Sequence, residues 1–141
     1  MRLELGYPNE ENERALITGI DRREMLKDIS PSLQPETLLE LQDYAAKVHM
    51  SEPLVDYIQA LVRFTRESPD IETGLSPRGA LALVAAARAH AFMQHHSGVF
   101  PDDVQAVFSS VAGHRLKPAS SSVYRTPTEL SRHVLDNVAI P

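Results

Sequence analysis

The feature that most restricts the fold of this chain is residues 76–96, a segment whose side chains are apolar over most of its length. Ser76 is suited to cap a helix and Pro77 to occupy its first turn, so the sequence predicts a helix start there. Every residue from Ala80 to Ala87, and again from Ala91 to Met93, is apolar. A helix that is apolar all round needs partners on several sides. We therefore expect it at the centre of a helical bundle.

The rest of the chain supplies helices that fit around such a centre. The strongest amphipathic pattern follows Ser51, which we expect to cap its helix, with apolar residues at positions i, i+1, i+4, i+7 and i+8. Further helices are predicted to open at Asn9, Pro35, Pro101 and Thr126. In the first of these, Leu16, Ile17 and Ile20 are expected to face inward. The fold class predicted is all-α, a small bundle of about five to six helices.

Residues 1–7, MRLELGY, alternate apolar and polar side chains, as a strand does. This is the only good strand signal in the sequence, and a lone strand is not stable. Either the segment belongs to a sheet outside this chain, or it packs as an extended arm. Gly6 and Pro8 are expected to end it.

Composition excludes several classes of protein. The chain has 141 residues and no cysteine, so it forms no disulfide or thiolate metal site, which fits a reducing compartment. Its net charge of −5, the absence of tryptophan and the lack of a basic cluster argue against a nucleic-acid partner. There is no secretory segment and no uncharged apolar run of roughly 18 residues, so we expect no membrane contact and a cytoplasmic location.

Arg78 stands where electrostatics disfavours a cation, because the start of a helix already carries partial positive charge. One explanation is that its guanidinium, beside the free N–H groups of the helix start, binds an anion such as phosphate. The alternative is a surface arginine paired with Asp70 or Glu72. The residues alone leave both open.

Other candidate chemistry has simpler explanations. His90, His95 and His96 lack the i, i+4 spacing of helical metal ligands, so we interpret them as solvated histidines at a helix end. The acidic pairs Glu10–Glu11 and Asp102–Asp103 sit in first helical turns, where they complement the helix dipole. The serines at 120–122 lie in a polar stretch and are interpreted as linker, and the C-terminal helix after it as detachable.

Four stretches carry a resemblance to a known family. In order and spacing, MRLELGYP, HMSEPLVDYIQALVRFTR, GLSPRGALALVAAARAHAF and VFPDDVQAVFSSVAGHRL resemble the C-terminal part of the MoxR-type AAA+ ATPases. The resemblance covers nearly the whole chain and is weakest at 117–125. Its most specific combination is the G-x-S-P-R element at 74–78, followed by an alanine-rich helix and PDDV.

The resemblance implies a division of the chain and a role for three residues. Residues 1–8 would be the last strand of the nucleotide-binding core and a hinge, with Tyr7 and Pro8 close to the nucleotide. The helical lid would span 9–116, followed by a linker at 117–125 and a C-terminal helix at 126–141. Arg78 would be the sensor 2 residue, which contacts the γ-phosphate of bound ATP.

The same resemblance implies what the chain lacks and which partners it has. Walker A, Walker B, sensor 1, the arginine finger and the Mg²⁺ ligands fall outside it, and no glycine-rich phosphate loop occurs in the sequence. The chain alone should therefore not hydrolyse ATP, although the parent protein would. Implied partners are the parent's own P-loop core and the neighbouring subunits of a ring, expected to be a hexamer. The resemblance also implies two further partners, a von Willebrand A-domain protein and a client protein on which this chaperone-like motor acts.

Two other hypotheses stay open at this level. The stretch 117–125 followed by a capped amphipathic helix would suit a stand-alone helical module that binds another protein and has no nucleotide role. A helix-turn-helix DNA-binding domain is suggested only by the number of short helices, and the acidic charge disfavours it.

Overall fold

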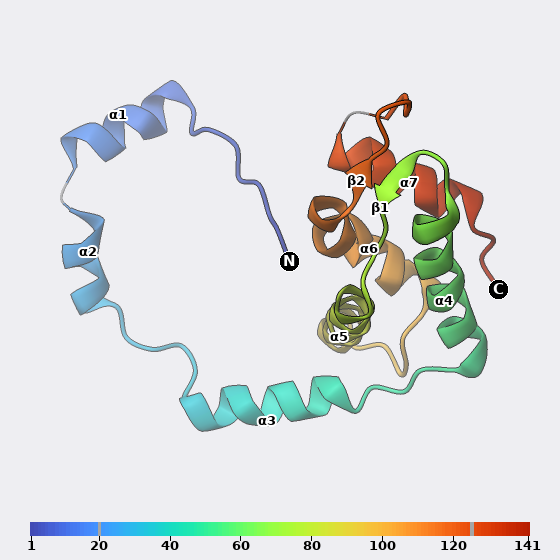
Figure 1. Cartoon of the computed structure of the whole chain (residues 1–141). Helices are drawn as coiled ribbons and strands as arrows, with labels where there is room; N and C mark the ends of the chain where they lie inside the picture. The colour runs from blue at the N-terminus through green and yellow to red at the C-terminus, as the bar shows by residue number, and fades with distance from the viewer. Residues whose placement is uncertain (20, 125) are drawn as a thin grey trace.

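The computed structural model describes residues 1–19, 21–124 and 126–141. The described residues form seven α-helices, two short 3₁₀ helices and a two-stranded sheet, so the all-α prediction is confirmed (Figure 1). The elements are α1 (Glu10–Thr18), α2 (Arg22–Met25), η1 (Leu26–Asp28), α3 (Pro35–Ala46), α4 (Glu52–Glu67), β1 (Ile71–Thr73), α5 (Pro77–Met93), α6 (Pro101–Ala112), η2 (Gly113–Arg115), β2 (Lys117–Pro118) and α7 (Pro127–Asn137).

Helix α5 is the central element, as predicted, but it is not covered all round. It packs most extensively against α6 and also against α3. Its buried positions are Gly79, Leu83, Ala87 and Ala91, a single stripe. Leu81 is 72% exposed, so one apolar side of α5 faces solvent.

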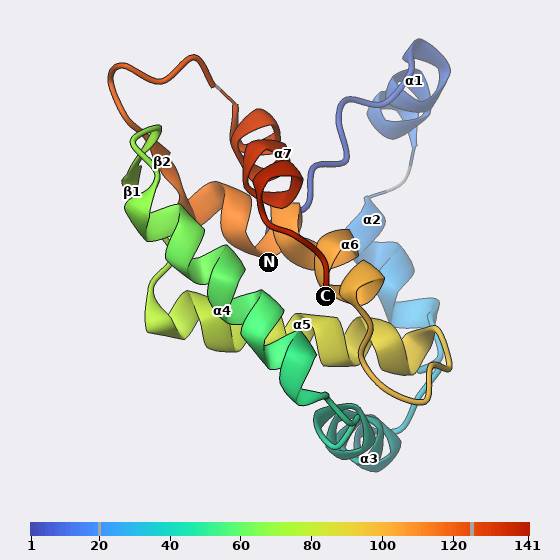
Figure 2. The ribbon, with the colours of Figure 1, turned by 90° about the vertical axis from the view of Figure 1, so that its right-hand side faces the viewer.

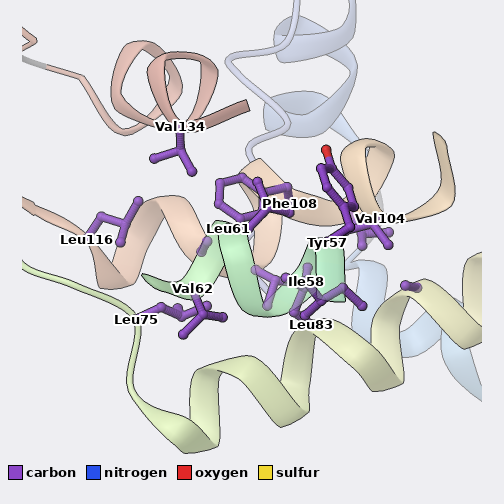
Figure 3. Close-up of a cluster of buried hydrophobic side chains, with 14 of the residues drawn as sticks. Tyr57, Ile58, Leu61, Val62, Leu75, Leu83, Val104, Phe108, Leu116 and Val134 are labelled. Carbon is purple, nitrogen blue, oxygen red and sulfur yellow. The ribbon is translucent and has the colours of Figure 1, made fainter. Parts of the chain in front are cut away.

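The hydrophobic core lies between α4, α5, α6 and α7 (Figure 3). Leu61 from α4, Leu83 from α5, Phe108 from α6 and Val134 from α7 are all fully buried and come together there. Tyr57 turns its ring into the same cluster, and its hydroxyl accepts a hydrogen bond from Gln105 Nε2 at 3.1 Å. The pattern after Ser51 therefore predicted the inner face of α4 correctly, although the Ser51 side chain makes no capping hydrogen bond.

The structure contains a two-stranded sheet that the sequence analysis did not predict. The structure assigns no strand to residues 1–9, which run without regular structure. Instead β1 and β2 pair antiparallel, with Ile71 opposite Pro118 and Thr73 opposite Lys117. Residues 1–7 have no partner strand within this chain, so they form none here. That they belong to a sheet outside this chain stays a prediction.

The C-terminal helix is part of the core and not a detachable piece. Leu130 and Val134 of α7 are buried, and α7 packs on α6, η2 and α4. The preceding stretch is also engaged, because it contains β2 and the fully buried Ser122. Its predicted capping box is present: Thr126 Oγ1 accepts from Glu129 N–H, and Glu129 Oε2 accepts from Thr126 N–H.

Residues 1–46 form a segment that we call the arm, and residues 47–141 form the body. None of the arm residues whose exposure the structure describes is buried. Arg2 N–H donates to the Ser110 carbonyl at 2.7 Å, the chain then runs outward through α1 and α2, and α3 returns to the body (Figures 1 and 2). Asn9 caps α1 as predicted. Leu16 and Ile17, expected to face inward, are 53% and 80% exposed, and Ile20 lies outside the described residues.

Candidate functional site

The segment 74–78 is held against α4 by two hydrogen bonds of the Leu75 backbone, one from its N–H and one to its carbonyl. Leu75 N–H donates to Thr65 Oγ1 at 2.9 Å, and the Leu75 carbonyl accepts from Arg66 Nε at 2.9 Å. The Leu75 side chain is 1% exposed and belongs to the core. Thr65 Oγ1 in turn donates to the Val62 carbonyl, so the hydroxyl that receives this segment is itself held in place.

Gly74 is required by the close approach of this segment to α4. A Cβ at this position would lie 2.4 Å from the Thr65 carbonyl oxygen and 2.9 Å from Arg66 Cα. Both are backbone atoms, which cannot rotate away as a side chain can. The glycine is therefore explained by packing alone, independently of any ligand.

The start of α5 is equally well defined. Ser76 Oγ accepts from Gly79 N–H at 3.1 Å, which confirms the predicted cap, and Pro77 occupies the first turn. Gly79 is packed so closely that a Cβ there would lie 2.7 Å from Leu75 Cδ1. Gly74 and Leu75 are thus packed against α4, and Ser76 and Gly79 fix the start of α5 beside them.

Arg78 projects from the first turn of α5 with no protein partner in the described part of the chain. It is exposed, and no hydrogen bond or ion pair of its guanidinium is found there. The two carboxylates that could have paired with it are engaged elsewhere: Glu72 binds Lys117 at 2.9 Å, and Asp70 lies 3.6 Å from His133 Nε2. The ion-pair alternative is therefore not realised.

An open groove of about 870 Å³ lies beside this turn, between α4 and α5. Pro77, the neighbour of Arg78, lines it together with the exposed side of α5 at Leu81. On the α4 side, the groove is lined by Val55, Arg63 and Arg66. The surface next to Arg78 is thus apolar along its length and carries further guanidinium groups.

Tyr7 and Pro8, the other predicted site residues, are not brought to this groove. Both are exposed, Tyr7 completely, and they lie in the irregular segment just before α1. Gly6 adopts a left-handed φ of 67°, which suits a change of chain direction before Pro8. Their role as a hinge stays a prediction.

The structure reveals one polar cluster that the sequence reading misjudged. His90 Nδ1 lies 2.8 Å from Asp103 Oδ1, and His96 Nδ1 lies 3.1 Å from both carboxylate oxygens. Asp103 is fully buried and also accepts from Phe100 N–H. The prediction of solvated histidines at a helix end is wrong for His90, which joins α5 to the start of α6 through Asp103. His96, in the loop after α5, binds the same carboxylate but is exposed, so that prediction holds for its solvation and not for its lack of a partner.

Two opposing effects act on the pKa of Asp103. Burial raises it, because a carboxylate loses hydration, but the hydrogen bonds from Phe100 N–H and the two histidines outweigh burial and lower the pKa below its ordinary value. Asp103 is therefore a charged anchor between helices. Within residues 1–19, 21–124 and 126–141, no group of three His, Asp or Glu side chains is arranged to hold a metal ion.

These features define a small helical domain that presents one unpaired arginine at the start of its central helix. A family model described as the AAA lid domain matches residues 63–133, which include the anchoring residues, Arg78 and α6. The chain belongs to the AAA lid domain family. No helix among the described residues is long and apolar enough to cross a membrane.

Individual relatives extend the likeness to the whole chain. The chain is 31% identical over 153 residues to Chaperone MoxR1 of Mycobacterium tuberculosis, covering 99% of this chain and 40% of that protein. It is 28% identical over 142 residues to the uncharacterized protein YeaC of Bacillus subtilis, covering 99% and 44%.

A solved structure has the same fold. A crystal structure of a protein described as a candidate ATPase from Cytophaga hutchinsonii superposes with a TM-score of 0.73 at 26% identity, over 97% of this chain and 45% of that one. The chain therefore spans less than half the length of these relatives.

Proposed function

We propose that this chain is the nucleotide-sensing lid of a MoxR-type AAA+ ATPase. In this proposal Arg78 is the sensor 2 arginine, and a P-loop core elsewhere in the same protein supplies the ATP. The observation that carries the proposal is an exposed arginine without a protein partner, on a turn fixed by Gly74, Leu75 and Ser76. An arginine held in this way favours an anion brought to it from outside the domain.

The lid residues have separable tasks in this proposal. Arg78 offers planar N–H donors suited to a phosphate group, and the start of α5 adds partial positive charge. Thr65 and Arg66 hold the turn, so that the guanidinium approaches the phosphate only when the whole lid moves. Because ATP carries one more phosphate than ADP, differential contact with Arg78 would bias the lid toward closure in the ATP state.

The remaining parts of the reaction are proposed to come from the rest of the parent protein. ATP with Mg²⁺ would be bound by the P-loop core, and we assign no Mg²⁺ ligand and no catalytic residue to this chain. Tyr7 and Pro8 would form the hinge to that core. By likeness to a relative named as a chaperone, the parent would act on client proteins. The resemblance of the sequence to MoxR-type ATPases adds that it would be a cytoplasmic hexameric ring with a von Willebrand A-domain partner.

ATP turnover of the long protein tests the role of Arg78. We expect Arg78→Ala to lower kcat at least about tenfold, since a donor aimed at transition-state charge is worth that much or more. ATP affinity should fall while ADP affinity is retained, because only the γ-phosphate contact is removed. Arg132→Ala is the matched control, since Arg132 is also exposed but lies on α7.

The fold of each variant is checked by thermal unfolding. Both substitutions are on the surface, so each should change the free energy of unfolding by no more than about 0.5 kcal/mol. Wild-type turnover in Arg78→Ala would refute the sensor assignment. Equal loss in Arg132→Ala would also refute it, because the effect would then not be specific to the start of α5.

The stand-alone interaction module loses the feature that suggested it. That hypothesis was suggested by a C-terminal helix expected to be detachable. In the structure, α7 instead contributes Leu130 and Val134 to the core. Deleting residues 118–141 would therefore unfold the body rather than remove a docking element, so we give this alternative no separate proposal.

A further inference from the structure

We infer that Arg115 is a positioning residue for Arg78, and that it ties the start of α5 to the end of α6 so that the Arg78 guanidinium is presented outward. The inference rests on the proposed function, which makes Arg78 the contact to the nucleotide. It goes further by naming a second arginine on which that contact depends. Arg115 acts through Arg78 and not on the nucleotide itself.

The chain around Arg115 runs beside the segment that leads into α5. β2, which follows Arg115, pairs antiparallel with β1, which precedes Gly74. Leu116 and Leu75, one from each of these segments, belong to the same buried cluster (Figure 3). The short helix η2, which contains Arg115, is therefore held next to the start of α5 by both backbone pairing and core packing.

The aliphatic stem of Arg115 lies against the first turn of α5. A Cβ added to Gly79 would be 3.5 Å from Arg115 Cδ, an ordinary van der Waals contact. Gly79 is buried, and its N–H binds the Ser76 side chain that caps the helix. The stem of Arg115 thus packs on the residue that follows Arg78 in the chain, on the buried side of α5.

The guanidinium of Arg115 is bound to the other helix. Its Nη1 donates a hydrogen bond to the Val111 carbonyl, in the last turn of α6. Carbonyls in the last turn of a helix lack partners within the helix, and their partial negative charge favours a cation. This bond sets the direction of the Arg115 side chain, so that its stem lies across the start of α5. One side chain therefore joins the end of α6 to the turn that carries Arg78.

The positive charge of Arg115 is not neutralised by a carboxylate. None of the ion pairs found among the described residues includes it, whereas the nearby Lys117 is paired with Glu72. A neutral side chain of equal length would fill the space beside Gly79 without adding charge. The arginine instead places a like charge beside the base of Arg78. Repulsion between like charges favours orientations in which the Arg78 guanidinium points away from the body.

A double-mutant cycle on the ATP turnover of the long protein tests the inference. Arg115→Ala should lower kcat by about five- to tenfold and weaken ATP binding, because a displaced Arg78 guanidinium keeps only part of its contact. ADP affinity should be retained, as expected for Arg78→Ala. In the Arg78→Ala background, Arg115→Ala should change kcat by less than about twofold, since no guanidinium is left to position.

Two further variants separate the stem of Arg115 from its charge. Arg115→Lys keeps both and should retain at least about half of the wild-type kcat, because the lysine Nζ can also donate to the Val111 carbonyl. Arg115→Met keeps only the stem and should lose as much turnover as Arg115→Ala. His114→Ala is the matched control, since His114 is exposed in the same turn, and it should turn over ATP as the wild type does. Thermal unfolding checks that each variant is folded.

Three results would overturn the inference. The first is wild-type turnover in Arg115→Met, which would show that the stem suffices. The second is independent losses that multiply in the double variant, because Arg115 would then act without Arg78. The third is an equal loss of ADP affinity and ATP affinity in Arg115→Ala, which would indicate a general structural role.

Failure of this inference is distinguishable from failure of the proposed function. A loss of turnover in Arg78→Ala together with wild-type turnover in Arg115→Ala would retain the sensor role and reject the positioning role. Wild-type turnover in Arg78→Ala would reject both.

Discussion

Replacing Gly74 by alanine tests whether the turn that carries Arg78 is fixed by its contact with α4. The added Cβ would lie 2.4 Å from the Thr65 carbonyl oxygen, 2.7 Å from its carbon and 2.9 Å from Arg66 Cα. These atoms belong to the backbone of a packed helix, so the segment 74–78 must move away. Forcing a methyl group into a packed site costs about 1–3 kcal/mol.

Two further terms enter the expected change. Moving the segment weakens the hydrogen bond from Leu75 N–H to Thr65 Oγ1, worth about 0.5–1.5 kcal/mol. Alanine also lowers the conformational entropy of the unfolded chain, which offsets about 0.4–1 kcal/mol of this loss of stability. The free energy of unfolding should therefore fall by about 2 kcal/mol. For a chain of this length this lowers Tm by roughly 6–10 °C.

Urea unfolding followed by circular dichroism measures this change. Gly98→Ala is the matched control, because its nearest contact would be 3.3 Å and the next two 4.0 Å. We expect that variant to lose less than about 1 kcal/mol. A Gly74→Ala protein as stable as the wild type would refute the reasoning, since it would mean that the turn can leave α4 at no cost.

Two other predictions concern buried polar groups. Asp103→Asn should lower the free energy of unfolding at pH 7 by about 2 kcal/mol, because the histidines and Phe100 N–H lose a charged acceptor. Since the folded pKa of Asp103 is lowered, its contribution is present above the unfolded value near 3.8 and is lost as the pH falls through the folded value. Urea titrations at several pH values should show the wild type and Asp103→Asn converging below pH ~4, and parallel curves would contradict this reasoning. Thr65→Val should cost about 1–3 kcal/mol in the same assay, because Leu75 N–H is left buried without an acceptor; an unchanged unfolding midpoint would show that this hydrogen bond contributes nothing.

The features that the sequence predicted correctly depend on near neighbours in the chain. Ser76 caps α5 through Gly79, and Thr126 caps α7 through Glu129, each three residues away. Such signals are complete within one helical turn, which makes them readable from the sequence, although the predicted Ser51 cap forms no such hydrogen bond. The amphipathic pattern of α4 succeeded for the same reason, because a single helix face carries it.

The features that were missed depend on residues far apart. The bond between His90 and Asp103 exists because α5 and α6 lie side by side, and no spacing within either helix indicates it. The pairing of Thr73 with Lys117 likewise follows from tertiary structure. In the arm the periodicity of Leu16 and Ile17 marks an apolar face correctly but does not say what covers it.

The two short strands hold the backbone that leads to α5 and Arg78. β1 ends one residue before Gly74 and pairs with β2, and the Asp70 carbonyl accepts from Ala119 N–H at 2.8 Å. His133 Nε2 of α7 lies 3.6 Å from the Asp70 carboxylate. The segment is therefore joined to α4 and to the C-terminal region at once. Displacing the backbone that leads to Arg78 would break these contacts, so we expect Arg78 to move together with the body although its side chain is in water.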